Sequence, residues 1–490
     1  MSQNLTLVTS NPILTDPSTE FWYLMGIKGV AMASLAQILI DAGHRVAGCD
    51  VAEDFVTAEL LSRLPIELEV GFDHLLPTGV TTLVYTAAHQ GQFNPIVQQA
   101  RAKGVRTLSQ AEALAEFFNQ KQGVAVCGVG GKSTVSAMIT WILEKIGQQP
   151  SFSVGVGSIP GLDRTGQWLP KSQWFVAEAD EYVIDPSAPS RDEPIVPRFS
   201  FFQPFLTVCT NLEYDHPDVY RDFSHTQTVF RDFFSQIKPG GVLIINQDSV
   251  GLQKVMATLI TQLATKNITL VNFGETATAN WWLSDYQVKP GQSQAKLHYQ
   301  NQIFELLLPI PGKFNLKNAL AAVAAVVALG FEPQAAVTAL ADFHSTKRRF
   351  ELIGTKNGVI YYDDYGHHPH EVYQAIKALN DWYPAAHKLI VFQSHTFSRT
   401  KQLFAEFVEA FREADEVAMI EIFPSAREAF DASVTSDGLC AAITAKYPTI
   451  KVKNYRDLKT LATYCQENLK PGDVCLTIGA GDVYVLHDLL

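Results

Sequence analysis

The chain has 490 residues, of which 47% are hydrophobic, and its formal net charge is -12. This length predicts three domains of ordinary size, and the hydrophobic content is sufficient for sizeable cores and argues against disorder. The negative charge argues against non-specific binding to nucleic acid or to an anionic membrane, so local groups must hold any anionic substrate.

The cysteines and the apolar segments indicate a cytoplasmic location. The six cysteines are scattered without a CxxC pair, a spacing that excludes a zinc knuckle and indicates reduced thiols. The first 20 residues lack the basic start and apolar core of a signal peptide. The longest apolar run, 319–329, is too short to span a bilayer, so we expect a buried helix there and no membrane insertion.

The first predicted unit is a strand, a glycine turn, a helix and a second strand. The strand covers 21–26, the helix covers about 29–42, and the second strand ends at Asp50. An acidic residue about 24 positions after the glycine turn is typical of a Rossmann-type unit. The dinucleotide fingerprint is broken because Lys28 and Ala31 stand where glycines belong. NAD is therefore disfavoured, and a nucleotide held by a related turn is favoured.

Residues 124–134 read VAVCGVGGKST and carry the strongest functional signal in the chain. A short β-branched run enters a glycine turn that opens a helix, as in a phosphate-binding loop. Glycine N–H groups would close on phosphate oxygens, Lys132 would reach the outer phosphates, and Ser133 would ligate Mg²⁺. Only two residues separate Gly128 from Gly131, so the standard Walker spacing is absent. The alternative is a tight turn with a solvated lysine.

Acidic and amide residues follow the strands of the central segment. Strands are predicted there at 174–179, 205–211 and 241–246. The motif EADE begins at Glu178, and TNLEYDH ends at His216. Because parallel strands place ligands at their carboxyl ends, we expect Glu178 to serve Mg²⁺ and His216 to act as a ligand or base. The alternatives are a charged loop and a structural histidine.

The segment GKFNLKN at 312–318 opens the Ala-rich helix, and two interpretations of Asn315 and Asn318 are open. Asparagine side chains near a helix start can cap the helix. Alternatively, they read the edge of an adenine while Phe314 offers an aromatic face.

A third set of strands follows the basic connector KRRFE at 347–351. The predicted strands cover 359–364, 389–394, 417–423 and 474–479. Helical stretches alternate with them, which predicts another mostly parallel sheet.

Two strand exits in this third set carry candidate ligands. In DDYGHHP at 363–369, substrate contact or ribose recognition by aspartate is favoured over a metal site, because no third metal ligand is near at a useful spacing. In HTFSRT at 395–400, Arg399 is a candidate partner for a carboxylate or a phosphate. The alternative is a solvated arginine at a helix start.

Together these motifs resemble those of the Mur ligases, the ATP-dependent amide-forming enzymes of peptidoglycan precursor assembly. The matching segments are GIKGVAM, GVGGKST, EADEY, TNLEYDH, GKFNLKNALAA, KRRFE, DDYGHHP, FQSHTFSRT and GAGD. The resemblance implies an α/β fold of three domains. These are an N-terminal Rossmann-like UDP-sugar-binding domain at 1–120, a central P-loop ATPase-type parallel sheet at 121–345, and a C-terminal Rossmann-like domain for the amino acid at 346–490.

The resemblance also implies roles for individual residues. ATP would be bound by Gly128, Gly130, Gly131, Lys132, Ser133, Thr134, Asn315, Asn318, Arg349 and, at its ribose, Asp364. Mg²⁺ would be held by Ser133, Glu178 and His216. The UDP-sugar would lie among Gly26, Gly29, Asp50 and Ser109. The catalytic set would be Lys132, Glu178, His216, His367 and Arg399, of which the last two would face the incoming amino acid.

The segments DDYGHHP and FQSHTFSRT are typical of the alanine-adding branch. This branch implies ATP-dependent joining of L-alanine to the carboxylate of UDP-N-acetylmuramate through an acyl phosphate, with ATP and Mg²⁺, by a monomer or weak homodimer. The stretch after EADEY is longer than this branch normally carries, which leaves open a murein-peptide ligase that adds a tripeptide. Val129, Gly130 and Thr396 depart from the family pattern, which leaves open a non-catalytic ligand-binding relative. A plain P-loop kinase is disfavoured because it would not need the outer two domains.

Overall fold

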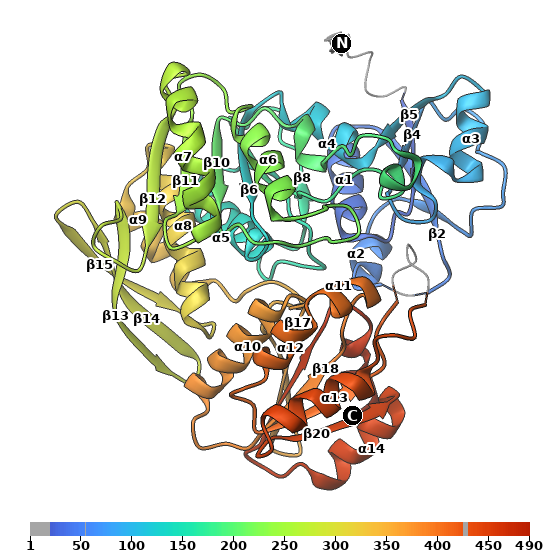
Figure 1. Cartoon of the computed structure of the whole chain (residues 1–490). Coiled ribbons are helices and arrows are strands. Elements are labelled where there is room, and N and C mark those ends of the chain that lie inside the picture. Colours follow the sequence, from blue (N-terminus) through green and yellow to red (C-terminus); the bar gives the residue numbers. More distant parts are fainter. Residues whose placement is uncertain (1–19, 54, 425–429) are drawn as a thin grey trace.

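The computed structural model describes residues 20–53, 55–424 and 430–490, which form three β-sheets with helices packed on them. Figure 1 shows the first sheet (blue) beside the second (cyan to yellow), with the third (orange to red) below them. The predicted α/β class with three parallel-sheet units is confirmed. In the part of the chain described, no helix is long and apolar enough to cross a membrane. The segment judged for a signal peptide lies almost entirely outside the described residues.

The first sheet has five parallel strands in the order β3-β2-β1-β4-β5. The strands are β1 (Phe21–Met25), β2 (Arg45–Asp50), β3 (Glu67–Val70), β4 (Thr82–Tyr85) and β5 (Arg106–Ser109). The helices are α1 (Val30–Asp41), α2 (Ala58–Ser62), the 3-10 helix η2 (Gly91–Phe93), α3 (Pro95–Ala102) and α4 (Gln110–Phe118). The predicted strand–turn–helix–strand unit is confirmed, and all five residues of β1 are buried, as expected for a central parallel strand.

The second sheet has ten strands in the order β15-β14-β13-β12-β11-β10-β6-β9-β7-β8. The strands are β6 (Gln122–Cys127), β7 (Ser151–Ser153), β8 (Gly166–Gln167), β9 (Trp174–Glu178), β10 (Leu206–Cys209), β11 (Val242–Asn246), β12 (Thr269–Gly274), β13 (Trp281–Lys289), β14 (Gln292–Tyr299) and β15 (Gln302–Leu308). The helices are α5 (Lys132–Lys145), η3 (Ala188–Arg191), η4 (Arg198–Phe201), α6 (Phe223–Phe234), α7 (Val250–Thr265), α8 (Lys313–Ala328), α9 (Pro333–Ala339) and η5 (Leu340–Asp342).

The second sheet is parallel from β7 to β13, and antiparallel strands extend it at both ends. The three predicted central strands are confirmed. The antiparallel extension β13–β15 was not predicted from the sequence, and Figure 1 shows it reaching toward the C-terminal unit.

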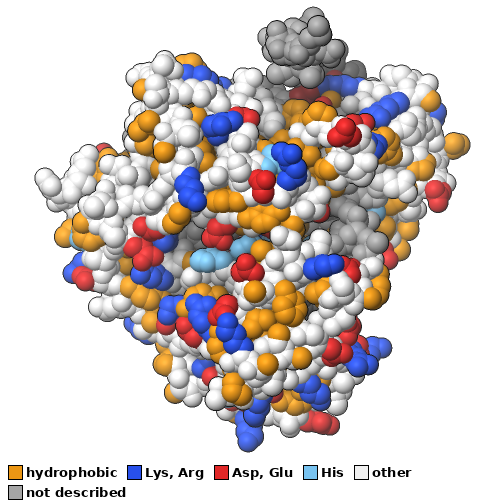
Figure 2. Space-filling model, viewed as in Figure 1, with side chains coloured by type: hydrophobic (Ala, Val, Ile, Leu, Met, Phe, Trp, Pro, Cys, Tyr) orange, Lys and Arg blue, Asp and Glu red, His pale blue; other side chains and the backbone are white. Residues whose placement is uncertain are grey.

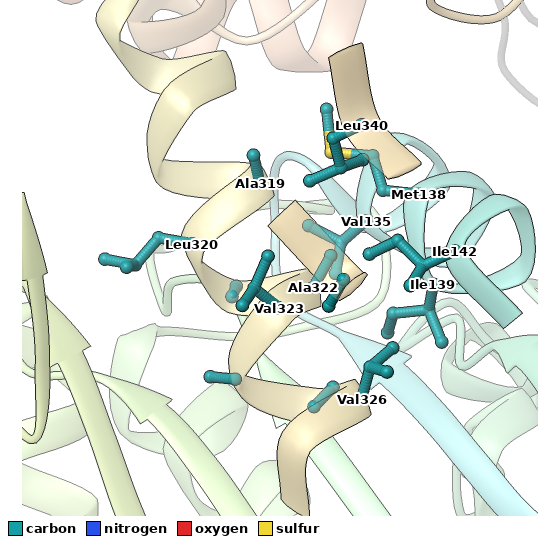
Figure 3. Close-up of a cluster of buried hydrophobic side chains, with 14 of the residues drawn as sticks. Val135, Met138, Ile139, Ile142, Ala319, Leu320, Ala322, Val323, Val326 and Leu340 are labelled. Atoms are coloured by element: carbon teal, nitrogen blue, oxygen red, sulfur yellow. The ribbon is translucent and has the colours of Figure 1, made fainter. Parts of the chain in front are cut away.

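Helices α5 and α8 build the apolar centre of the middle unit (Figure 3). Side chains three and four positions apart on each helix share a face, so each helix presents a continuous apolar stripe to the other. The facing side chains include Val135, Met138, Ile139 and Ile142 from α5, and Ala319, Ala322, Val323 and Val326 from α8. The buried helix predicted over 319–329 is confirmed. This packing fixes the start of α5, where the glycine turn enters the helix.

The third sheet has the order β16-β17-β21-β18-β19-β20 and is parallel except for the β16–β17 hairpin. The strands are β16 (Glu351–Lys356), β17 (Val359–Asp364), β18 (Lys388–Phe392), β19 (Glu416–Ile420), β20 (Lys451–Arg456) and β21 (Val474–Ile478). The helices are α10 (Pro369–Trp382), α11 (Phe397–Gln402), α12 (Phe404–Ala410), α13 (Ser436–Lys446), α14 (Leu458–Asn468), η6 (Val483–Val485) and α15 (Leu486–Leu489). The mostly parallel sheet predicted here is confirmed.

Helix α10 connects the C-terminal unit to the antiparallel extension of the middle sheet. The Trp382 indole N–H donates to the Ser293 hydroxyl at 3.2 Å, and the Tyr286 hydroxyl donates to Asp381 at 3.5 Å. Figure 1 shows α10 next to β13 and β14. The extension therefore supports one end of α10, while the other end of this helix reaches the functional site.

Candidate active site

A cavity of about 390 Å³ lies where the three units meet. Figure 2 shows charged side chains and histidines along the boundary between the upper and lower parts of the molecule. Of the residues singled out from the sequence, those that line the cavity are Gly131, Lys132, Ser133, Glu178, His216, Arg349, His367 and Arg399. Those singled out that do not line it are Gly26, Gly29, Asp50, Ser109, Gly128, Gly130, Thr134, Asn315, Asn318 and Asp364.

The turn between β6 and α5 requires its glycines. Gly128 has a φ of +124° and Gly131 has a φ of +83°, both in the region that favours glycine. A Cβ on Gly131 would lie 2.7 Å from Oδ1 of Asn318, and one on Gly128 would lie 2.3 Å from Oγ1 of Thr210. Helix α5 begins directly after Gly131 without a side-chain cap. Its first N–H groups are therefore available to an anion.

Lys132 is the first residue of α5, and its ammonium group is paired with a buried carboxylate. The Lys132 Nζ atom lies 3.0 and 2.9 Å from the two carboxylate oxygens of Glu181, whose side chain is 2% exposed. Burial alone would lower the pKa of Lys132, but Glu181 and the neighbouring carboxylates outweigh burial and raise it. The alternative of a solvated lysine is therefore wrong. Glu181 ends the EADE motif, but no role was predicted for it from the sequence.

Ser133 and Glu178 bring oxygen atoms together beside the turn. The Ser133 hydroxyl donates to Oε1 of Glu178 at 3.1 Å, and Oε2 of Glu178 accepts from the Gly155 N–H at 3.2 Å. Burial raises the pKa of Glu178. A hydroxyl and a carboxylate of this kind fit Mg²⁺, which prefers oxygen ligands and keeps several waters.

His216 lies on the same side of the cavity but contacts other carboxylates. Its Nε2 atom is 3.5 Å from Oε1 of Glu181 and 3.6 Å from Oδ2 of Asp215. Burial lowers the pKa of His216, but Asp215 and Glu181 outweigh burial and raise it. Among residues 20–53, 55–424 and 430–490, no group of three or more His, Cys, Asp or Glu side chains is arranged to hold a metal ion. The geometry thus pairs Ser133 with Glu178 and places His216 next to Glu181.

Arg349 and Glu371 of the C-terminal unit face the glycine turn. The Arg349 Nη2 atom donates to the Ser133 hydroxyl at 3.3 Å, and its Nη1 atom lies 3.9 Å from Oε1 of Glu371. A Cβ on Gly130 would lie 3.3 Å from the same Glu371 oxygen. Glu371 is a residue that sequence reasoning missed. The signal that could have found it is its position in the first turn of α10, where it forms a capping box with His368.

His367 lines the cavity together with Glu371 and Arg399. Burial, followed by the charge of Arg399, lowers the pKa of His367 to about 4. The imidazole is therefore neutral near pH 7, and its Nδ1 atom lies 3.7 Å from Oε2 of Glu371.

Arg399 is buried at the start of α11 and forms an ion pair across the boundary between two units. Its Nε and Nη2 atoms donate to the two oxygens of Asp215 at 2.9 and 3.3 Å, and Nη1 donates to the His395 carbonyl oxygen at 2.8 Å. The side chains of Arg399 and Asp215 are 6% and 3% exposed. The alternative of a solvated arginine is therefore wrong.

Asn315 and Asn318 lie behind the glycine turn. Asn315 donates to the Pro311 carbonyl oxygen at 2.7 Å, and Asn318 donates to Oδ1 of Asn315 at 3.3 Å. The N-cap of α8 is Gly312, and it makes no side-chain cap hydrogen bond. The interpretation of the asparagines as caps is therefore wrong.

Asp364 ends β17, and its carboxylate accepts hydrogen bonds from backbone N–H groups. Its two oxygens accept from the N–H groups of Phe350 and Gly366 at 2.8 and 2.7 Å. Burial raises the pKa of Asp364 to about 6.

The four residues expected around a UDP-sugar lie at the carboxyl edge of the first sheet. Asp50 accepts from the N–H groups of Lys28 and Val51 at 2.7 and 2.8 Å. Gly26 adopts a φ of +82°, Gly29 is the N-cap of α1, and Ser109 caps α4. The starts of α1 and α4, at Val30 and Gln110, line the cavity. This edge of the first sheet therefore opens toward the glycine turn of the middle unit.

Comparison with known proteins agrees with this arrangement. Three family profiles match consecutive segments: "Mur ligase family, catalytic domain" at 22–122, "Mur ligase middle domain" at 126–326, and "Mur ligase, glutamate ligase domain" at 348–481. A UDP-N-acetylmuramate–L-alanine ligase from Kineococcus radiotolerans is 36% identical over 465 residues, which cover 94% of this chain and 93% of that protein.

Two solved structures share the fold over nearly the whole chain. A UDP-N-acetylmuramate-alanine ligase from Thermotoga maritima matches with a TM-score of 0.75 and 20% identity, covering 96% of this chain and 97% of that one. A murein peptide ligase from Psychrobacter arcticus matches with a TM-score of 0.68 and 21% identity over the same shares. The sequence relative and the three family profiles each support the same assignment, so the chain belongs to the Mur ligase family.

Proposed function

We propose that this protein is an ADP-forming ligase that joins L-alanine to the carboxylate of UDP-N-acetylmuramate in peptidoglycan precursor synthesis. The observation that carries the proposal is the single cavity lined by Lys132, Ser133 and Glu178 of the middle unit and by Arg349 and Arg399 of the C-terminal unit. This set combines a phosphate-binding turn with a guanidinium for a second anionic group. The Kineococcus radiotolerans relative, which matches most of the chain, is a UDP-N-acetylmuramate–L-alanine ligase, and this supports the choice of substrates.

ATP is the proposed nucleotide. Its phosphates would lie on the turn formed by Gly128, Gly130, Gly131, Lys132, Ser133 and Thr134. The remainder of ATP would contact Asn315, Asn318, Arg349 and Asp364. Ser133 and Glu178 would hold Mg²⁺ with His216 nearby, and the ion would neutralise charge on the phosphate oxygens.

The proposed reaction has two steps, and the chain's residues act by position and charge. In the first step, a carboxylate oxygen of the sugar attacks the γ-phosphorus and ADP leaves with the electrons of the broken P–O bond. Lys132 and Arg349 offset the negative charge there. In the second step, the amine of L-alanine attacks the acyl carbon and loses a proton, and phosphate leaves from the tetrahedral state. His367 and Arg399 would face the amino acid, and enclosure among three units would exclude water.

We propose that each of the three units binds one substrate. Residues 1–120 bind the UDP-sugar through Gly26, Gly29, Asp50 and Ser109, residues 121–345 bind ATP, and residues 346–490 bind the amino acid. The strand sets of the three sheets, at 21–109, 122–308 and 351–478, support these boundaries. We propose a cytoplasmic protein that acts as a monomer or weak homodimer.

A substrate panel tests the proposal. Purified protein is given ATP, Mg²⁺ and UDP-N-acetylmuramate with L-alanine, glycine, L-serine or the murein tripeptide, and ADP formation is measured. ADP formation that depends on both the sugar and L-alanine is expected. Binding of ATP by calorimetry without turnover on any substrate would favour the non-catalytic alternative instead.

A murein-peptide ligase is the second candidate, and the long segment 184–204 favours it. Asp185 in this segment accepts from the Gln92 amide of the first unit at 2.9 Å, and Arg191 stacks over Phe93 at 4.7 Å. The segment therefore borders the side of the molecule proposed to bind the sugar. A higher kcat/KM with the tripeptide than with L-alanine in the same panel would select this candidate.

A further inference from the structure

Asp215 lies in the middle unit and forms its bidentate ion pair with Arg399 of the C-terminal unit. Both side chains line the cavity, and both are almost fully buried. The two residues are 184 positions apart, so the contact exists only when the two units are docked. A buried pair with this geometry fixes the orientation of a guanidinium far more firmly than a solvated pair does.

The hydrogen bonds of Arg399 leave part of its guanidinium for a ligand. The group has five N–H donors in a rigid plane. Asp215 takes one donor on Nε and one on Nη2, and the His395 carbonyl oxygen takes one on Nη1. One N–H on Nη1 and one on Nη2 remain. Charged N–H donors of this kind form strong hydrogen bonds with a carboxylate.

We propose that Asp215 is a positioning residue that holds Arg399 from across the domain boundary, so that its remaining N–H pair binds the carboxylate of the incoming amino acid. The inference rests on the proposed function of the same cavity. The amino-acid site is then complete only when the middle and C-terminal units are docked. Amino-acid binding and docking therefore favour one another.

Substitution Asp215→Asn tests this role. An amide can still accept one hydrogen bond, but it cannot pair both Arg399 nitrogens with a charge. The KM for L-alanine should rise by about tenfold or more, while the KM for ATP changes by less than about twofold. Asp215→Glu keeps the charge and should lie between the wild type and Asp215→Asn.

Comparison of L-alanine with L-alaninamide gives a measurement that a purely structural role would not change. L-alaninamide lacks the carboxylate but keeps the amine. The wild type should prefer L-alanine by a large ratio of kcat/KM, and Asp215→Asn should reduce this ratio by about tenfold. An unchanged ratio in both Asp215 variants would overturn the inference.

A matched control is available in the same molecule. Asp41 of α1 forms another bidentate pair across a domain boundary, with Arg164 of the middle unit at 3.0 and 3.2 Å. Asp41→Asn should lower the melting temperature without changing the preference for L-alanine. If Asp215→Asn behaves in the same way, Asp215 only stabilises the fold and the inference is wrong.

Two further outcomes distinguish failure of the inference about Asp215 from failure of the proposed function. Asp215 is next to His216, so an increased Mg²⁺ requirement with unchanged discrimination against L-alaninamide would assign Asp215 to the metal side and overturn the inference. If the wild type itself forms no ADP with UDP-N-acetylmuramate and L-alanine, the proposed function fails. If the wild type is active and only the Asp215 prediction fails, the proposed function stands.

Discussion

Two strand–glycine turn–helix units in this chain each place a lysine at the turn, and the two lysines have different surroundings. Lys28 follows β1, and its Nζ atom donates to the carbonyl oxygens of Val51, Ala52 and Glu53 at 2.8, 3.3 and 2.7 Å. Lys132 follows β6, and its Nζ atom pairs with the Glu181 carboxylate. The first lysine secures its own loop, and the second faces the cavity.

The difference has a local cause and a distant one. Lys28 precedes the N-cap Gly29, so its side chain leaves the turn beside β2, where backbone carbonyls are close. Lys132 is the first helical residue of α5, so it lies where the helix N-terminus attracts anions. Three backbone carbonyl oxygens bind the ammonium group of Lys28, whereas a phosphate can compete with Glu181 for Lys132. The same strand–turn–helix pattern thus serves structure in one unit and ligand binding in the other.

The largest expected effect distinguishes the two lysines directly. Lys132→Met should reduce ADP formation by about 10³-fold because the phosphates lose their cation. The same change removes the lysine that pairs with the buried Glu181 and should lower the free energy of unfolding by about 3 kcal/mol. The double variant Lys132→Met/Glu181→Gln should recover most of the stability but not the activity. Near-normal turnover in the double variant would remove Lys132 from the phosphate site.

The end of a third strand, at Asp364, extends the comparison to the pH dependence of stability. Asp364, like Asp50, ends a strand and accepts two backbone N–H groups, and burial raises its pKa from 3.8 to about 6. Between pH 3.8 and pH 6 the Asp364 carboxyl binds its proton more tightly in the folded protein than in the unfolded chain. The protein therefore loses stability as the pH rises through this range, and the loss is complete above pH 6. Relative to wild type, Asp364→Asn should therefore gain stability from about pH 4 to pH 6.5, by up to about 3 kcal/mol. Urea unfolding across this range measures the gain, and a pH-independent difference would contradict the prediction.

The glycines of the two turns should respond differently to alanine. Gly131 has a φ of +83°, and its Cβ would meet Asn318, whereas Gly29 has a φ of -63° and its Cβ would meet nothing closer than the Gly26 carbonyl oxygen at 3.5 Å. Gly131→Ala should cost about 2 kcal/mol of stability, because of left-handed strain and the displaced amide. Gly29→Ala should change stability by less than about 0.5 kcal/mol. Equal costs in urea unfolding would show that the two turns tolerate a side chain equally.

Substitution of Lys28 should affect stability but not activity. Lys28→Met removes three hydrogen bonds to carbonyl oxygens and should cost about 1–2 kcal/mol of stability. The kcat and the KM for ATP should remain as in the wild type, because this ammonium group lies outside the cavity. Loss of ATP affinity in this variant would show that the first turn also serves the nucleotide.

The sequence by itself determined the repeating local units of the fold. The spans of β1 and α1 agree with the sequence predictions to within one residue, and α5 begins directly after the predicted glycine turn. Buried parallel strands, glycine turns and helix starts are encoded by neighbouring residues, so they can be identified without tertiary information. The same local patterns identified Lys132, Ser133, Glu178 and the third-unit motifs as candidates for one site, because parallel strands present their ends at one edge.

Only the tertiary structure determined which charged side chains form ion pairs. Glu181 reaches Lys132 from 49 positions away, and Asp215 reaches Arg399 from 184 positions away. The extension β13–β15 was missed as well, since partly exposed antiparallel strands carry a weak hydrophobic pattern and their support of α10 depends on docking. Partners of this kind are set by sheet order and by the packing of one unit on another. No pattern of neighbouring residues contains that information.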